Sequence, residues 1–463
     1  MTFNSFAFLV VFLPLAVAGY FLVGRRWSKA WLLLASLVFY SGGRLQDLPV
    51  LLGSVAVNCL VAPKLVRRGW LLFGAVSANV LFLCYFKYAA FFVETFNQLT
   101  GATVGVPHAA FPLGISFFTI IQIMFLVDRY EGLVEECHWL DYLVFAGFFP
   151  YVSMGPIVRW KQVVPQLNDP KGWRLNPDNV ARGLFILVIG LFKKVVLADS
   201  FFLWADAGFS YAHPLSLVGG WIAALAFTFQ LYFDFSGYTD MAIGAALMFN
   251  INLPQNFNAP FRAQSISDFW RRWHMTLTNF FTTYLYTPMI RSMKKVTFAK
   301  AMLATLATMV IIGFWHGANW TFVIFGALHG VALVLNQCWK KLKWPMPAPL
   351  GWFLTFTFVV AALVFFRSAD VAQATRILAS MFSLRGGLFS YEPWTGIGRV
   401  DQLLGVGWML FGIATQIRGS SSLELQRRFQ PSWATVAVSV ALAVVSFVYV
   451  NGVVSRSFLY RDF

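Results

Sequence analysis

The sequence predicts an all-α polytopic membrane protein, built as a single helical membrane domain over residues 1–463. Hydrophobic residues make up 59% of the chain and charged residues only 12%, and the mean hydropathy is +0.67. Soluble domains carry about a quarter charged residues, so this chain lacks the polar surface that water requires. Many windows of about 17 or more residues are almost free of charge, which is long enough for a helix to cross the hydrocarbon of a bilayer. Short basic clusters separate these windows, as at Arg25, Arg26 and Lys29.

The apolar segments can be followed in order from the N-terminus. Residues 5–24 have no positive charge before them and Arg25 and Arg26 after them, which predicts a retained helix with its N-terminus outside rather than a signal peptide. We expect about 11 to 13 transmembrane or embedded helices in total. The further candidates lie near residues 30–42, 48–62, 69–86, 111–127, 140–158, 183–205, 215–233, 300–316, 320–338, 351–366, 402–417 and 433–450.

Three of these segments are interrupted by proline or glycine. They read "FPLGISFF" (111–118), "FFPYVSMGPIVRW" (148–160) and "YFDFSGYTDMAIG" (232–244). Irregular backbone at membrane depth is tolerated only where protein shields it or where it lines a water-filled cavity. The interruptions therefore predict a bundle that surrounds a polar pocket.

Residues 265–281, "SISDFWRRWHMTLTNFF", predict an amphipathic helix at the membrane interface. Ser265 and Asp268 fit a capping box at its start. Its apolar side carries Ile266, Phe269, Trp270, Trp273, Leu277, Phe280 and Phe281, and its polar side carries Ser267, Arg271, His274 and Thr278.

Four charged residues are candidates for substrate binding. Asp234 and Asp240 lie in an apolar run, where a carboxylate usually turns inward to a partner or a cavity. We favour a structural role for them, with a buried arginine as the partner. Arg271 and Arg272 suit a phosphate clamp, although contact with lipid headgroups explains them as well.

The run "IIGFWHGANW" (311–320) places His316 in apolar surroundings, and His274 is a second such imidazole. The ordinary pKa of an imidazole is about 6.5, so a buried one stays neutral and can accept a proton from an alcohol as a general base. Gly313 and Gly317 would let a substrate approach the backbone. Asn319 would orient the ring or donate to an oxyanion. A purely structural role for His316 at a helix end has similar weight to the general-base role.

Other chemistry has little support. The net charge of +16 suits anionic headgroups better than nucleic acid, because the basic residues lie between apolar runs. No metal site is expected, since Cys59, Cys84, Cys137 and Cys338 lie far apart without CxxC spacing. No nucleophile elbow, P-loop or dinucleotide fingerprint stands in a fitting context, which favours direct transfer without a bound cofactor.

Several motifs together resemble the membrane-bound O-acyltransferase (MBOAT) family, over residues of about 5–340, with further helices at about 345–455. They are "LYFDFSGYTDMAIG", "SISDFWRRWHMTLTNFF" and "GFWHGANW", with "FPLGISFFTIIQIMFLVDRY", "FFPYVSMGPIVRW" and "GLFKKVVLAD" in support. Within the family they are similar to the bacterial alginate O-acetylation branch, which includes the teichoic-acid D-alanylation protein.

The resemblance implies a ring of tilted helices around a central funnel in the inner membrane of a bacterium. It implies that His316 is the catalytic histidine and His274 the second signature histidine. The donor would be acetyl-CoA or another acyl thioester, including an acyl carrier, on the cytoplasmic side. The acyl group would pass to a polysaccharide or glycan hydroxyl, or to a periplasmic partner acetyltransferase of the SGNH type.

Two departures bear on the acceptor. The branch commonly reads "YIPLGGNR" where this chain has "YTPMIRSMKK" (286–295), and it commonly ends "FIYFQF" where this chain ends "FLYRDF" (458–463). An exopolysaccharide or surface glycan other than alginate is thus at least as good an acceptor. The alternatives to an enzyme are a transporter, since broken helices also fit alternating access, and a non-catalytic scaffold of a surface-polysaccharide export complex.

Overall fold

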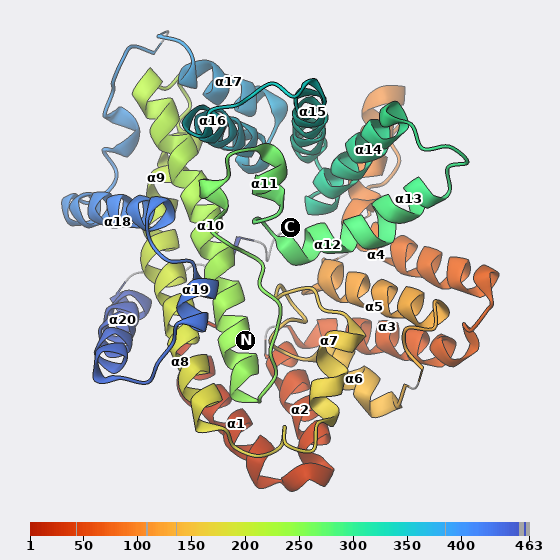
Figure 1. The fold of residues 1–463 in the computed structure, drawn as a ribbon. Coiled ribbons are helices and arrows are strands. Elements are labelled where there is room, and N and C mark those ends of the chain that lie inside the picture. The colour runs from red at the N-terminus through yellow and green to blue at the C-terminus, as the bar shows by residue number, and fades with distance from the viewer. Residues whose placement is uncertain (43, 108–109, 136, 385, 453–457, 460–463) are drawn as a thin grey trace.

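The computed structural model describes the chain except for residues 43, 108–109, 136, 385, 453–457 and 460–463 (Figure 1). Within this described part, every regular element is a helix. The α-helices are α1 (Leu13–Leu22), α2 (Gly24–Ser41), α3 (Leu48–Val61), α4 (Gly69–Thr100), α5 (Ile115–Tyr130), α6 (Trp139–Gly147), α7 (Trp160–Asn168), α8 (Pro177–Phe192), α9 (Asp199–Ser210), α10 (Leu217–Met248), α11 (Ile266–Trp270), α12 (Met275–Phe281), α13 (Thr287–Arg291), α14 (Phe298–His316), α15 (Trp320–Leu342), α16 (Ala348–Arg367), α17 (Val371–Met381), α18 (Arg399–Ile417), α19 (Ser422–Arg427) and α20 (Trp433–Gly452). Short π-helical stretches join some of them, namely η1 (Ala7–Phe12), η4 (Lys193–Ala198) and η6 (Thr282–Tyr286).

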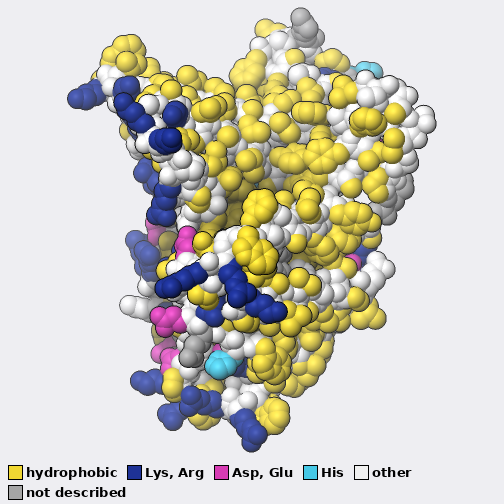
Figure 2. All heavy atoms as spheres, turned by 90° about the vertical axis from the view of Figure 1, so that its right-hand side faces the viewer, with side chains coloured by type: hydrophobic (Ala, Val, Ile, Leu, Met, Phe, Trp, Pro, Cys, Tyr) yellow, Lys and Arg dark blue, Asp and Glu magenta, His cyan; other side chains and the backbone are white. Residues whose placement is uncertain are grey.

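The predicted all-α polytopic membrane fold is confirmed. Among the described residues, eight helical segments are long and apolar enough to cross a membrane, and shorter apolar helices such as α5 and α8 pack among them. Figure 2 shows hydrophobic side chains over most of one face of the molecule, with lysine and arginine gathered toward one side. This distribution matches an apolar belt next to a charged membrane interface.

The 32-residue helix α10 is the centre of the packing, and it runs straight through the third predicted interruption. That prediction is wrong because the glycines there serve close helix contact rather than a break. A Cβ atom on Gly237 would lie 2.7 Å from the carbonyl oxygen of Gly190, and one on Gly244 would lie 2.5 Å from that of Gly183. Without side chains at these positions, the backbones of α10 and α8 approach closely.

The other two interruptions are present. Gly114 precedes α5 with φ of +70°, and a Cβ atom there would lie 2.5 Å from the carbonyl oxygen of Val152. Residues 148–159, between α6 and α7, form turns without a continuous helix. Residues 148–158 are buried in protein, as the membrane environment requires, whereas only Pro112 is buried among residues 110–114.

The amphipathic helix expected over residues 265–281 is divided into α11 and α12. Its backbone breaks at Arg271–His274, where His274 adopts the left-handed conformation with φ of +42°. An extended neighbouring segment replaces the helical hydrogen bonds, since Asn258 N donates to Arg272 O (3.0 Å) and Met275 N donates to Asn256 O (2.9 Å). The prediction of one continuous amphipathic helix is therefore wrong, and the break turns the imidazole of His274 into the protein.

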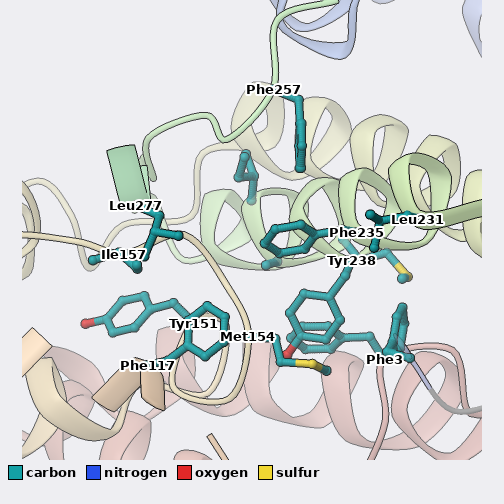
Figure 3. Packing of buried hydrophobic residues seen from close by; sticks show 14 of the residues in the cluster. Phe3, Phe117, Tyr151, Met154, Ile157, Leu231, Phe235, Tyr238, Phe257 and Leu277 are labelled. Atoms are coloured by element: carbon teal, nitrogen blue, oxygen red, sulfur yellow. The ribbon is translucent and has the colours of Figure 1, made fainter. Parts of the chain in front are cut away.

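Apolar side chains from distant parts of the chain pack around this break. Figure 3 shows Phe235 and Tyr238 of α10 above Phe3 and Met154, with Leu277 of α12 close to Ile157. In Figure 1, α11 and α12 cross the middle of the molecule, and α10, α14, α15 and α5 lie around them. The broken helix thus stands inside the bundle.

Candidate active site

His316 is the last residue of α14 and is 3% exposed. Its ring lies among aromatic rings, with centroid distances of 5.0 Å to Trp315, 5.1 Å to Phe366 and 6.3 Å to Phe325. The next residue, Gly317, is extended and ends the helix. The apolar run of α14 thus delivers one imidazole to the protein interior, as the sequence predicted.

The residues that flank His316 have structural tasks in this fold. A Cβ atom on Gly317 would lie 2.2 Å from the Phe322 ring, and one on Gly313 would lie 2.3 Å from the Phe322 carbonyl oxygen. These glycines therefore admit α15 and not a substrate. Asn319 accepts from Thr321 N (3.0 Å) as the N-cap of α15, and its amide group donates to Ala369 O (2.7 Å). Both ends of its side chain thus hold the α14–α15 connection.

His274 is fully buried at the break between α11 and α12. Its Nδ1 lies 3.3 Å from Oδ1 of Asn256, an oxygen that also accepts from Oγ1 of Thr276 (2.6 Å). An amide oxygen can only accept, so Nδ1 carries the proton and Nε2 presents a lone pair. Burial lowers the pKa of His274 to about 3, which keeps the ring neutral.

Trp315 brings the two imidazoles into one site. Its ring centroid is 5.0 Å from that of His316 and 6.4 Å from that of His274. Among the described residues, Nε2 of His274 and Nε1 of Trp315 are buried and lack a hydrogen-bond partner. Buried polar atoms are rarely left unpaired, so these two atoms are candidates for hydrogen bonds to a ligand or a water molecule.

Lys87 lies beside the same site, although the sequence analysis did not select it. It projects from α4, and its Nζ donates to Trp315 O (2.6 Å) and lies 3.4 Å from Oγ of Ser116. Tyr88 donates to Phe314 O (3.1 Å). The Lys87 amine and the Tyr88 hydroxyl thus bond to the last carbonyl groups of α14. The pair fixes the end of the helix that carries His316.

Asp234 and Asp240 are buried on α10, but their partners are lysines and not the predicted arginine. Lys194 contacts Asp234 (2.8 Å) and Asp199 (2.9 Å), and Lys193 contacts Asp240 (2.7 Å). The double lysine of η4 therefore neutralises both aspartates. These ion pairs connect α10 to η4, which agrees with the structural role favoured above.

Arg271 and Arg272 stand at the break of the amphipathic segment. Both contact Asp268, at 3.6 Å from Nη2 of Arg271 and 3.0 Å from Nε of Arg272. Ser265 caps α11 by accepting from Asp268 N (3.2 Å), while the Asp268 carboxylate contacts these arginines. The Arg271 side chain is 71% exposed, so of the two arginines it is the more accessible to an anion.

Nδ1 of a third buried imidazole, His329 of α15, accepts from Nε1 of Trp270 (3.2 Å). This bond joins α15 to α11, just before the residues that hold His274. In the sequence, His329 interrupts an apolar run, within "FGALHG" (325–330). No group of three or more His, Cys, Asp or Glu residues suited to a metal ion occurs in the described part of the chain.

The fold and the site together define a polytopic membrane protein that buries two imidazoles around Trp315, beside polar atoms without a hydrogen-bond partner. A sequence profile of the membrane-bound O-acyltransferase family matches residues 78–366, which include Lys87, His274 and His316. The chain belongs to this family and is an O-acyltransferase.

Curated relatives place it in the bacterial branch that the motifs predicted. The peptidoglycan O-acetyltransferase of Helicobacter pylori is 37% identical over 100% of this chain and 98% of its own length. The probable alginate O-acetylase AlgI of Pseudomonas aeruginosa is 37% identical over 83% of this chain and 75% of its own length. The teichoic acid D-alanyltransferase of Bacillus subtilis is 29% identical over 50% of this chain and 61% of its own length.

Proposed function

We propose that this protein transfers an acetyl group from a cytoplasmic thioester to a hydroxyl group of a cell-surface glycan, with His316 as the general base. The observation that carries the proposal is the pair of buried imidazoles around Trp315, with two polar atoms left unpaired. The enzyme would lie in the inner membrane of a bacterium, with its basic clusters on the cytoplasmic side.

The reaction is a direct acyl transfer. The acceptor hydroxyl oxygen attacks the thioester carbonyl carbon while its proton passes to the imidazole of His316. The tetrahedral intermediate then collapses, the carbon–sulfur bond breaks, and the thiolate takes the proton from His316. The products are the acetyl ester and the free thiol, and general base catalysis of this kind contributes about 10²- to 10⁴-fold to the rate.

The unpaired atoms suit two further roles in this reaction. Nε1 of Trp315 is a donor only, so it would donate to the carbonyl oxygen of the thioester as negative charge develops there. Nε2 of His274 is an acceptor, so it would hold the acceptor hydroxyl or assist the transfer of its proton. Arg271 and Arg272 lie at the break next to His274 and would contact phosphate groups of acetyl-CoA or of an acyl carrier.

A peptidoglycan hydroxyl is the acceptor we favour over alginate. The H. pylori enzyme aligns with the whole of this chain, whereas the alginate relatives align with 83% of it. The departure at residues 286–295 agrees with an acceptor other than alginate. The acetyl group would reach the glycan directly or through a periplasmic SGNH-type acetyltransferase. Tyr460–Phe463 of the second departure lie outside the described residues.

The acceptor can be tested in a bacterium that lacks its own peptidoglycan O-acetylation. We expect that expression of this chain, with and without a co-expressed periplasmic acetyltransferase of the SGNH type, restores ester-linked acetate on purified peptidoglycan. Mass spectrometry of the released muropeptides locates the ester. Acetate that appears on an exopolysaccharide and never on peptidoglycan would contradict the acceptor but keep the acetyltransferase, while no ester on any glycan would contradict both.

A further inference from the structure

A groove of about 590 Å³ lies outside the histidine site, where the C-terminal end of α15 meets the start of α16 and the residues before α11. Its inner wall holds Asn336, whose Oδ1 accepts from Oγ of Ser267 (2.7 Å), and Ser265, the cap of α11. Figure 1 shows α11, α15 and α16 as neighbours in this region. The groove thus joins three elements that are far apart in sequence.

One edge of the groove is basic and aromatic. Lys340 and Lys343 line it, and no carboxylate pairs with either within the described residues. Trp339 and Trp344 stand beside them with ring centroids 5.2 Å apart, and Nε1 of Trp339 donates to Trp344 O (3.1 Å). Tryptophan with lysine at a helix end is typical of the headgroup level on the cytoplasmic side of a membrane.

The opening of the groove is apolar. Leu335 is 63% exposed, Trp344 59% and Leu354 49%. Exposed aliphatic side chains beside a membrane helix end would contact acyl chains, whereas a water-soluble anion such as coenzyme A would leave them without a partner. The combination of apolar opening and free lysines favours a ligand with both an anionic headgroup and hydrocarbon chains.

We propose that this groove binds one anionic phospholipid of the cytoplasmic leaflet. Its phosphate lies between Lys340 and Lys343, its glycerol region lies against the Trp339–Trp344 pair, and an acyl chain follows Leu335 and Leu354. The bound lipid bridges α15, α16 and the cap of α11. The site is separate from the acyl-transfer chemistry and stands whether or not the proposed acceptor is right.

Native mass spectrometry of the purified full-length protein tests the site. The probes are phosphatidylglycerol, phosphatidylcholine with the same chains, glycerol phosphate and coenzyme A. We expect one phosphatidylglycerol to bind in preference to phosphatidylcholine, and the K340Q/K343Q variant to bind it about tenfold more weakly. The matched control is K294Q/K295Q, which removes two exposed lysines from the loop before α14 and should bind as the unchanged protein does.

A second measurement needs no variant. Phosphatidylglycerol with a photoreactive acyl chain should crosslink to peptides from residues 332–358. Equal binding of both lipids, unchanged binding by K340Q/K343Q, or crosslinks confined to other helices would overturn the proposal. Binding of coenzyme A that depends on Lys340 and Lys343 would overturn it as well, because the groove would then be a site for a soluble anion.

Discussion

His316→Ala is expected to lower glycan O-acetylation by about 10²- to 10⁴-fold while the protein remains in the membrane at normal abundance. The reason is the position of the imidazole at the end of α14, 3% exposed and beside the unpaired Nε1 of Trp315. Without it, the acceptor hydroxyl loses the imidazole that we propose takes its proton. The measurement is ester-linked acetate on isolated glycan, with membrane abundance determined by immunoblot.

His213→Ala is the matched control, because it removes an exposed imidazole outside the site. It should leave acetylation unchanged. Normal acetylation by His316→Ala would exclude the general-base role. Loss of the protein from the membrane would instead show that His316 serves folding, and His316→Gln would then separate the two effects by keeping a polar side chain of similar size.

Lys194→Met is expected to lower the free energy of unfolding by about 3 to 5 kcal/mol. Lys194 is 1% exposed and its Nζ contacts both Asp199 and Asp234. Methionine fills much of the same volume but removes the cation that contacts both buried carboxylates. The loss should appear as a lower midpoint of thermal denaturation in detergent.

Arg367→Met is the control for this result. Arg367 forms an ion pair with Asp206 and has an aromatic ring beside its guanidinium group. The side chains of this pair are 28% and 43% exposed. Such a pair contributes about 0.2 to 1 kcal/mol. Adding Asp199→Asn and Asp234→Asn to Lys194→Met should recover part of the loss, since the buried charges are gone. A denaturation midpoint for Lys194→Met equal to that of Arg367→Met would contradict the buried-charge argument.

The sequence was sufficient for the fold class, because spanning helices require long apolar runs that composition reveals directly. It was misleading where one residue type serves two purposes. The glycines of "YFDFSGYTDMAIG" suggested a break, yet Gly237 and Gly244 lie in the middle of α10 and admit α8. A glycine that breaks a helix cannot be told from one that permits close helix contact until the neighbouring helix is known.

In the candidate site, too, the sequence could predict some residues and not others. His316 and His274 stand out as titratable groups in apolar surroundings, so they could be selected from the sequence. Lys87 could not, since the predicted span ended at residue 86 and its partners, the carbonyl groups at the end of α14, are more than 200 residues away. The left-handed backbone of His274 has no local signal either, because the hydrogen bonds that fix it come from Asn256 and Asn258.

The central claim is that His274 and His316 act as one site, and a double-mutant cycle tests it most directly. The rate of glycan acetylation is measured for His274→Ala, His316→Ala and the double variant at equal membrane abundance. Residues that act as a unit are non-additive. We predict that the double variant retains the residual rate of the more impaired single variant. Two reductions that multiply in the double variant, or a His274→Ala enzyme with the full rate, would contradict a shared role in acyl transfer.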